Sequence, residues 1–341
     1  MTDAKKIKIG NKLIGEGQRT FIIAEAGVNH NGDFEVAKKM VKIAADAGAD
    51  AITFQHIIGE ELNVSTEKLD FSTDLWKKWL FSDNELEELF KYASDLNLLC
   101  SACIIEKESM EKIIKYGAPF LKIVSGDLTN LPFLEYCATK GLPILLSTGA
   151  ATLGEVETAI NAIQSKGCQD IVIYHTNSGY PTPPEEVNLK VMDTLKSAFR
   201  LPVGFCDHTV EVMTPIVAVA REANIIEKHF TLSRNLKGPD YEVSLEPDEL
   251  KEMIRSIRLI EKMLGSPIKK PLKYEEETRK FARRSIVSNV NIKKEEVIIE
   301  EMLAFKRPGT GIAPSFLNLI VGKKAKCDIN KDKIIAWDMI F

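Results

Sequence analysis

The sequence has no long hydrophobic run, no excess of positive charge and few cysteines. None of its apolar runs approaches the ~18 residues that a membrane span needs, and the N-terminus lacks the long apolar segment of a signal peptide. The 45 Lys and Arg residues are outnumbered by 49 Asp and Glu residues, which argues against the basic stripe of a nucleic-acid binder. Six cysteines in 341 residues do not form a disulfide scaffold. These absences predict a cytoplasmic globular protein with no membrane or nucleic-acid partner.

Two of the cysteines, Cys100 and Cys103, have C-x-x-C spacing, but no second pair follows at the distance of a zinc site. We therefore interpret them as small core residues, which is how free cysteines mostly behave.

Short apolar runs rich in β-branched residues recur along the chain, with helical patterns between most of them. The runs lack polar alternation, which is typical of strands buried on both faces. They cover residues 20–26, 51–55, 98–104, 120–126, 143–149, 171–177, 201–207 and 224–230. Between them, the spacing in 33–48, 84–96 and 153–164 predicts amphipathic helices, the first capped by Asp33.

Eight strands that alternate with helices over about 250 residues predict a (β/α)8 barrel. A doubly wound open sheet is the alternative, and it is weakened because no G-x-G-x-x-G follows the first run.

Polar side chains stand at or just past the C-terminal ends of seven of the eight runs. In a barrel these ends meet on one face, which is where active sites lie. The residues are Glu25, Gln55, Ser125, Ser147, Asn177, His208 and His229.

Two of the last three runs end on a histidine, His208 and His229, in a chain with five histidines. If these runs are neighbouring parallel strands, they lie ~5 Å apart and the imidazoles can share one divalent metal. Asp207 and Glu227 lie close to these histidines in the sequence. Asp207 could hydrogen-bond to a metal-ligating side chain and orient it without contacting the metal. Two nitrogen ligands leave positions for water or substrate, which favours a Lewis acid over a structural ion. The alternative is two unrelated polar loop residues.

The last part of the chain differs from the rest in its pattern of predicted helices, strands and turns. The pattern of residues 247–264 predicts an amphipathic helix. This helix is the last element of a predicted catalytic barrel domain over 1–264. A polar, lysine-rich stretch over 265–284 predicts a linker with a short helix. Short strands and turns then predict a small β domain over 285–341, which is too small to bury much by itself and is expected to dock on something.

Several motifs make the chain resemble the sialic acid synthase family. They are "AEAGVNHNGDF", "KIVSGDLTNLPFL", "LSTGAATLGEVETAI", "TNSGYPTPPEEVNL", "DHT", "IEKHFTL", "GPDYEVSLEPDELKEM" and "KRPGTGI". The resemblance runs in order from about residue 15 to the end. It implies a TIM barrel followed by a small antifreeze-like (SAF) domain, in a domain-swapped homodimer. It also implies condensation of phosphoenolpyruvate with an N-acetylated hexosamine aldehyde to a nine-carbon 2-keto acid, with a divalent metal, Mn²⁺ or Mg²⁺.

The resemblance carries over to individual residues. It implies that Glu25 is the essential glutamate and that His208 and His229 hold the metal. It implies that phosphoenolpyruvate is bound by Lys122, Ser125, Ser147 and Asn177. It implies that the sugar is bound by Gln55, Asp127, Tyr180 and Asp240. Arg307 matches an arginine that enters the partner's site and meets the N-acyl group.

Three positions depart from the family pattern at the expected phosphate end. This chain has Thr53 where the family usually has a lysine, Ala102 where it has a threonine and Cys206 where it has a serine. The segment before Tyr180 is also one residue longer than usual. Loss of one cation and two hydroxyls could remove ~4 kcal/mol of phosphate binding.

These departures leave two alternatives to an orthodox synthase. One is a metal-dependent, aldolase-type paralogue that uses another donor, and the other is a non-catalytic sugar-binding paralogue. The sequence identifies neither the amino sugar nor the metal.

Overall fold

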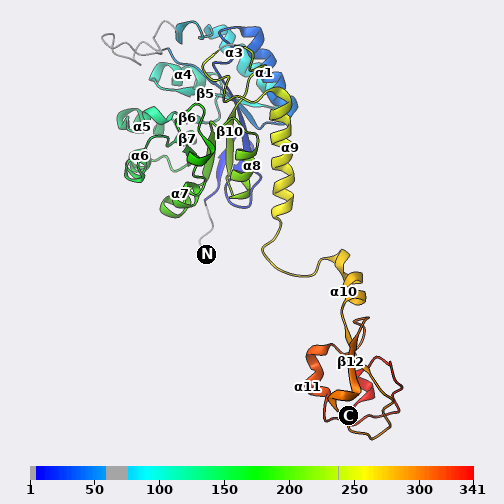
Figure 1. Cartoon of the computed structure of the whole chain (residues 1–341). Helices are drawn as coiled ribbons and strands as arrows, with labels where there is room; N and C mark the ends of the chain where they lie inside the picture. The colour runs from blue at the N-terminus through cyan, green and yellow to red at the C-terminus, as the bar shows by residue number, and fades with distance from the viewer. Residues whose placement is uncertain (1–4, 59–75, 237) are drawn as a thin grey trace. The chain divides into compact units, whose positions relative to one another are not determined.

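The computed structural model describes residues 5–58, 76–236 and 238–341, and the chain divides into two compact units, Met1–Gly265 and Ser266–Phe341. The first unit is a closed barrel of parallel strands in the order β10-β3-β4-β5-β6-β7-β8-β9 (Figure 1). The strands are β3 (Phe21–Gly27), β4 (Ala51–Gln55), β5 (Leu99–Ile104), β6 (Leu121–Ile123), β7 (Ile144–Ser147), β8 (Ile171–Thr176), β9 (Val203–Asp207) and β10 (Ile225–His229). The predicted barrel is confirmed, and the doubly wound alternative is wrong because β10 pairs with β3 and closes the sheet.

Helices follow the strands and cover the outside of the barrel. Asp33 caps α1 by accepting a hydrogen bond from the Val36 N–H, as its sequence predicts, and α3 and α6 each begin with a capping box. The helices are α1 (Phe34–Ala47), α3 (Asp83–Asp95), α4 (Lys107–Lys115), α5 (Leu131–Ala138), α6 (Leu153–Ser165), α7 (Val191–Phe199), α8 (Met213–Ala220) and α9 (Pro247–Leu264). None of the helices in the described ranges combines the length and apolarity needed to cross a membrane.

The barrel has an outer and an inner apolar cluster. The outer cluster fills the space between the strands and the helices. The inner one contains Ile7, Ile9 and Ile14 from an N-terminal hairpin, packed with barrel residues such as Phe21 and Tyr174. The hairpin strands are β1 (Ile7–Ile9) and β2 (Lys12–Ile14), which pair antiparallel. The sequence analysis did not anticipate this hairpin, which adds apolar side chains to the barrel interior.

The second unit has its own small core. After α10 (Glu276–Ala282), the strands β11 (Ser285–Ser288) and β12 (Leu303–Lys306) pair antiparallel, and α11 (Leu317–Ile320) follows. Isoleucines dominate the cluster of buried residues, which includes Ile286, Ile298 and Ile335. The predicted small, mostly β domain is confirmed.

Two buried histidines lie outside the inner barrel and influence stability. His30 packs its ring against Phe81, with the centroids 4.3 Å apart, and its Nδ1 accepts a hydrogen bond from the Gly32 N–H. Burial lowers the pKa of His30 to about 4 and that of His56 to about 4. Each histidine is therefore neutral in the folded chain at neutral pH, because burial disfavours the charged form.

We predict that His56→Gln makes the free energy of unfolding less dependent on pH. An unfolded His titrates near pH 6.5, so between pH 6.5 and 4 the unfolded chain binds the extra proton and stability falls as the pH falls. The substitution should remove up to about 3 kcal/mol of this loss. Urea unfolding at pH 7 and pH 4.5 measures it, with the exposed Lys39→Gln as a control. An equal pH dependence in the parent and in His56→Gln would contradict the prediction.

Candidate active site

A polar cavity of about 230 Å³ lies at the C-terminal ends of the barrel strands. Every barrel strand contributes a side chain to it directly or through the residues that follow its end. The described residues that line it are Glu25, Gln55, Cys103, Lys122, Val124, Ser125, Gly126, Ser147, Thr176, Ser178, Tyr180, Cys206, His208, Glu227 and His229. Eight residues that the sequence predicted for the site are among them: Glu25, Gln55, Lys122, Ser125, Ser147, Tyr180, His208 and His229.

Strand geometry decides which residues reach this cavity. Successive side chains of a strand point to opposite faces, so Cys206 and His208 face the interior while Asp207 faces the helices. The same alternation turns Glu227 and His229 inward and Lys228 outward. Asp207 and Lys228 are register partners and form a fully buried ion pair of 2.8 Å. Asp207 thus has a partner outside the cavity, in addition to the hydrogen bonds that it accepts from Thr209.

The two histidines face one another, with their ring centroids 5.4 Å apart. The Nδ1–H of His208 donates to the backbone oxygen of Asn177 at 2.5 Å, because a carbonyl can only accept. Its Nε2 therefore carries the lone pair and accepts from the Tyr180 hydroxyl at 3.0 Å. Burial lowers the pKa of His208 to about 4 and that of His229 well below its usual range. Both imidazoles are neutral at neutral pH, which is the state that ligates a metal.

The fit to a metal rests on these two side chains. Among the described residues, no three or more His, Cys, Asp or Glu side chains are grouped as metal ligands. The chain can therefore offer two neutral imidazoles at one end of the cavity, with His208 oriented by the Asn177 carbonyl behind it.

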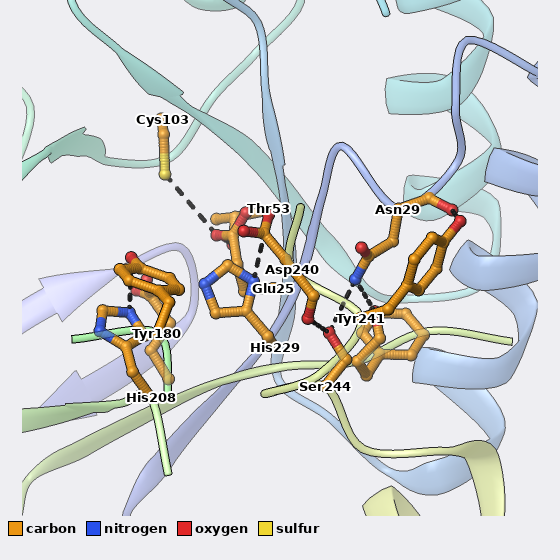
Figure 2. Close-up of polar contacts among 12 residues, drawn as sticks. Glu25, Asn29, Thr53, Cys103, Tyr180, His208, His229, Asp240, Tyr241 and Ser244 are labelled. Atoms are coloured by element: carbon orange, nitrogen blue, oxygen red, sulfur yellow. Dashed lines mark hydrogen bonds and ion pairs between the residues drawn. The ribbon is translucent and has the colours of Figure 1, made fainter. Parts of the chain in front are cut away.

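Glu25 lines the cavity and is almost completely buried. Its Oε2 accepts hydrogen bonds from the Thr53 hydroxyl and, at 3.6 Å, from the Cys103 thiol (Figure 2). Burial, reinforced by the charge of Glu227, raises the pKa of Glu25 to about 7. At neutral pH this carboxyl group is poised to give or take a proton.

Lys122 and Glu227 form a second buried ion pair, with Nζ 2.5 Å from Oε1. The ammonium group also lies 4.8 Å from the centroid of the Tyr174 ring. Burial by itself would lower the pKa of Lys122, but Glu227, together with smaller contributions from Cys206, Cys103 and Glu25, raises the pKa well above the usual value. Lys122 is therefore a cation that is already partly compensated inside the protein.

Hydroxyl groups gather at the ends of β6, β7 and β8. The Ser125 hydroxyl accepts a hydrogen bond from the Gly149 N–H at 2.9 Å, and a Cβ at Gly149 would collide with the Ser178 hydroxyl. Thr176 is buried, and its hydroxyl makes no hydrogen bond within the described ranges. The hydroxyls of this corner can donate hydrogen bonds to an anionic group.

The remaining predicted residues lie beside or away from the cavity. Asp127 accepts a hydrogen bond from Asn130 at 3.0 Å, and the Asn177 side chain donates to the backbone oxygen of Glu186 at 3.1 Å. Asp240 lies behind His229, with Oδ2 3.8 Å from Nδ1 (Figure 2). Arg307 is an exposed residue of the second unit.

The structure corrects one of the three departures at the expected phosphate end. Ala102 is the register partner of Phe54 and belongs to the outer apolar cluster, so its side chain faces the helices. The expectation that Ala102 costs the phosphate end of the cavity a hydroxyl is therefore wrong, since the residue of β5 that turns inward there is the next one, Cys103. Thr53 does face inward, toward Glu25, and Cys206 lies 3.6 Å from His208 Nε2.

Sequence reasoning missed Thr176 and Ser178 as cavity residues, interpreted Cys103 as a core residue and noted Glu227 only as a neighbour of the two histidines. The alternation rule applied backward from His229 would have found Glu227, and applied to the eight runs it would have found Cys103. No comparable rule identifies Ser178, because it lies in a loop.

Comparison with known proteins gives the same picture. Residues 40–269 match the NeuB family and residues 283–340 match the SAF domain. The chain is 45% identical to an uncharacterized protein of Methanocaldococcus jannaschii, covering 98% of each chain. It is 38% identical to the N,N'-diacetyllegionaminic acid synthase of Legionella pneumophila, covering 97% of each.

A solved structure agrees with these matches. The N-acetylneuraminic acid synthetase of Leptospira borgpetersenii, in complex with citrate, superposes with a TM-score of 0.76 at 36% identity, covering 81% of this chain and 95% of that one. The chain therefore belongs to the NeuB family, the sialic acid synthase family to which its sequence motifs pointed, and it carries a C-terminal SAF domain.

Proposed function

We propose that this protein is a nonulosonic acid synthase that condenses phosphoenolpyruvate with an N-acetylated hexosamine aldehyde, giving a nine-carbon 2-keto acid and phosphate. The observation that carries the proposal is the convergence of Glu25, the His208–His229 pair and the hydroxyl corner on one cavity of a NeuB family barrel. Release of phosphate from phosphoenolpyruvate, measured with N-acetylmannosamine and other N-acylated hexosamines, tests it. No release with any of them would overturn it.

The reaction needs groups of three kinds, and the cavity offers each. A divalent metal, Mn²⁺ or Mg²⁺, held by His208 and His229 would supply Lewis-acid polarisation of the aldehyde oxygen. The hydroxyls of Ser125 and Ser147 hold the anionic end of the donor together with Lys122, as neutral and charge-assisted donors. Glu25, with its pKa raised to about 7, accepts a proton from the water that adds to C2 of the donor.

The sugar is held on the other side of the cavity. Gln55 and Tyr180 line it, and Asp240, which the family resemblance assigns to the sugar, lies beside it with Oδ2 3.8 Å from His229 Nδ1. Tyr180 stacks on His208, with the centroids 4.1 Å apart, so that the sugar site and the metal site share one wall.

We predict that His208→Ala combined with His229→Ala abolishes both binding of Mn²⁺ and activity. The reason is that the described part of the chain groups no third side chain with the two imidazoles as a metal ligand. Titration calorimetry with Mn²⁺ measures uptake, and His56→Gln, which lies outside the cavity, is the matched control. Stoichiometric Mn²⁺ in the double variant would place the metal elsewhere.

We predict that Thr53→Lys tightens the binding of phosphoenolpyruvate. Thr53 points into the barrel interior beside Glu25, which lines the cavity, so a longer lysine there adds a charge-assisted contact of about 1.5–3 kcal/mol, which is about a tenfold to hundredfold lower Kd. Ala102→Thr is the control, because that side chain points into the outer core and should leave the Kd unchanged. Calorimetry with phosphoenolpyruvate decides it, and an unchanged Kd in Thr53→Lys would mean that the phosphate lies elsewhere.

We propose further that the protein is a homodimer in which the linker over 265–284 carries each SAF domain to the partner's barrel. The exposed position of Arg307 supports this, because a solvated guanidinium is free to meet an N-acyl oxygen.

Mixed dimers test this arrangement. We predict that mixing Arg307→Ala subunits with Glu25→Ala subunits restores part of the activity, since one of the two composite sites then has both residues. Each variant alone should be inactive or strongly impaired. Mixed dimers that form without regaining any activity would contradict the shared site.

A further inference from the structure

Lys228 is a charged side chain buried in an apolar part of the barrel. It lies on the outward face of β10 and is 0% exposed. The outward residues before it on β9 and β10 include Phe205 and Ile226, which belong to the outer apolar cluster. Burying an ammonium group costs free energy, and replacing a buried ion pair by apolar residues is often neutral or stabilising. Packing of the core therefore does not account for a lysine at this position.

The Lys228 ammonium group connects the residues on both sides of His208. Its Nζ lies 2.8 Å from Oδ2 of Asp207 and donates a hydrogen bond to the backbone oxygen of Thr209. Lys228 itself directly precedes His229 in the sequence. One buried cation is thereby bonded to the two neighbours of one imidazole and is covalently joined to the residue that carries the other.

Asp207 fixes the backbone on which His208 stands. Its Oδ1 accepts a hydrogen bond from the Thr209 N–H at 2.9 Å, and its Oδ2 lies 3.2 Å from the Thr209 hydroxyl. An aspartate that accepts from the N–H two residues later closes an Asx turn, and His208 is the central residue of this turn. A hydrogen bond of 3.0 Å joins the hydroxyls of Thr209 and Thr214, which ties the turn to α8.

Strand pairing carries the same constraint to His229. Lys228 is the register partner of Asp207 on β9 and of Ala24 on β3. Successive side chains of a strand point to opposite faces, so the anchoring of Lys228 on the outer face holds His229 toward the cavity. The two imidazoles, whose ring centroids are 5.4 Å apart, are thus supported from the outside of the barrel by one ion pair.

We propose that Lys228 is a positioning residue, which acts through Asp207 and Thr209 to hold His208 and His229 in the relative geometry that binds a divalent metal. The proposal rests on the proposed synthase function, because the metal is part of it. Groups behind metal ligands orient them, and their loss typically lowers metal affinity about tenfold to hundredfold. The contacts of Lys228 are with the residues beside the ligands, so it supports the backbone that carries the imidazoles.

The test is a double variant, Asp207→Asn with Lys228→Met, which removes both charges and keeps side chains of similar size. Since the pair is removed as a whole, no unpaired charge is left in the core. We expect the Kd for Mn²⁺ to rise about tenfold to hundredfold, while the melting temperature stays within about 4 °C of the parent's. Titration calorimetry and thermal unfolding measure the two quantities.

The matched control removes another largely buried ion pair of the same unit. Arg258 Nη2 lies 3.0 Å from Asp50 Oδ2, and Asp50 directly precedes β4, at the opposite end of the barrel from the cavity. Asp50→Asn with Arg258→Met should leave the Kd for Mn²⁺ at the parent's value. An unchanged Kd in the first double variant, or an equal loss in the control, overturns the proposal.

A milder variant, Lys228→Gln, covers the case in which the first double variant fails to fold. Its amide still donates to Asp207, so the charge-assisted bond becomes a weaker one. We expect the Kd for Mn²⁺ to rise about threefold to tenfold in this variant. The parent's Kd in Lys228→Gln overturns the proposal.

Failure of the synthase function is seen in a different measurement. A parent protein that binds Mn²⁺ but releases no phosphate from phosphoenolpyruvate with any N-acylated hexosamine contradicts the reaction, while the Kd values still decide the positioning role. A parent protein that binds no Mn²⁺ overturns the positioning role together with the metal site.

Discussion

The alternation of side chains along eight parallel strands is the constraint on which the rest of this protein depends. Because the sheet closes on itself, each inward position of a strand shares one confined space with the inward positions of the other seven. Apolar residues and the N-terminal hairpin fill one part of that space, and ionisable residues occupy the C-terminal end. The buried Asp207–Lys228 pair on the opposite face holds the ends of β9 and β10 together. The adjacent inward residues, His208 and His229, are thereby kept at a fixed separation.

The cavity concentrates charge in a place where water cannot screen it. Glu25, Glu227 and Asp240 bring three carboxyl groups to one end of the barrel, and Lys122 compensates one of them directly. The others adapt by changing proton affinity, since burial raises the pKa of Asp240 to about 6 and that of Glu25 to about 7. Perturbed groups of this kind cluster at functional sites. Here the physical cause is the depth of the strand ends, which the surrounding helices and loops keep from solvent.

Much of the fold and a good part of the site follow from sequence patterns, and the failures have physical reasons. The eight apolar runs coincide with the eight barrel strands, because strands buried on both faces must be apolar along their whole length. Family motifs placed Ala102 in the phosphate pocket, and the alternation of β5 turns it outward instead. The hairpin of β1 and β2 escaped notice because three-residue strands carry almost no periodic signal. Ser178 was missed since no pattern tells which residue of a loop turns inward.

The pairing of the first and last barrel strands has a consequence for how the chain is made. Phe21 pairs with Ile225, so the barrel cannot close until the ribosome has delivered almost the whole first unit. During that interval, Ile7, Ile9 and Ile14 have no complete interior to enter, and the open edge of β3 stays available to other chains. Contacts between residues so far apart in sequence slow folding, and exposed edges of this kind favour aggregation. The order of synthesis thus leaves the nascent barrel open to association until its last strand has emerged, whereas the core of the SAF domain comes from residues 286–340 alone.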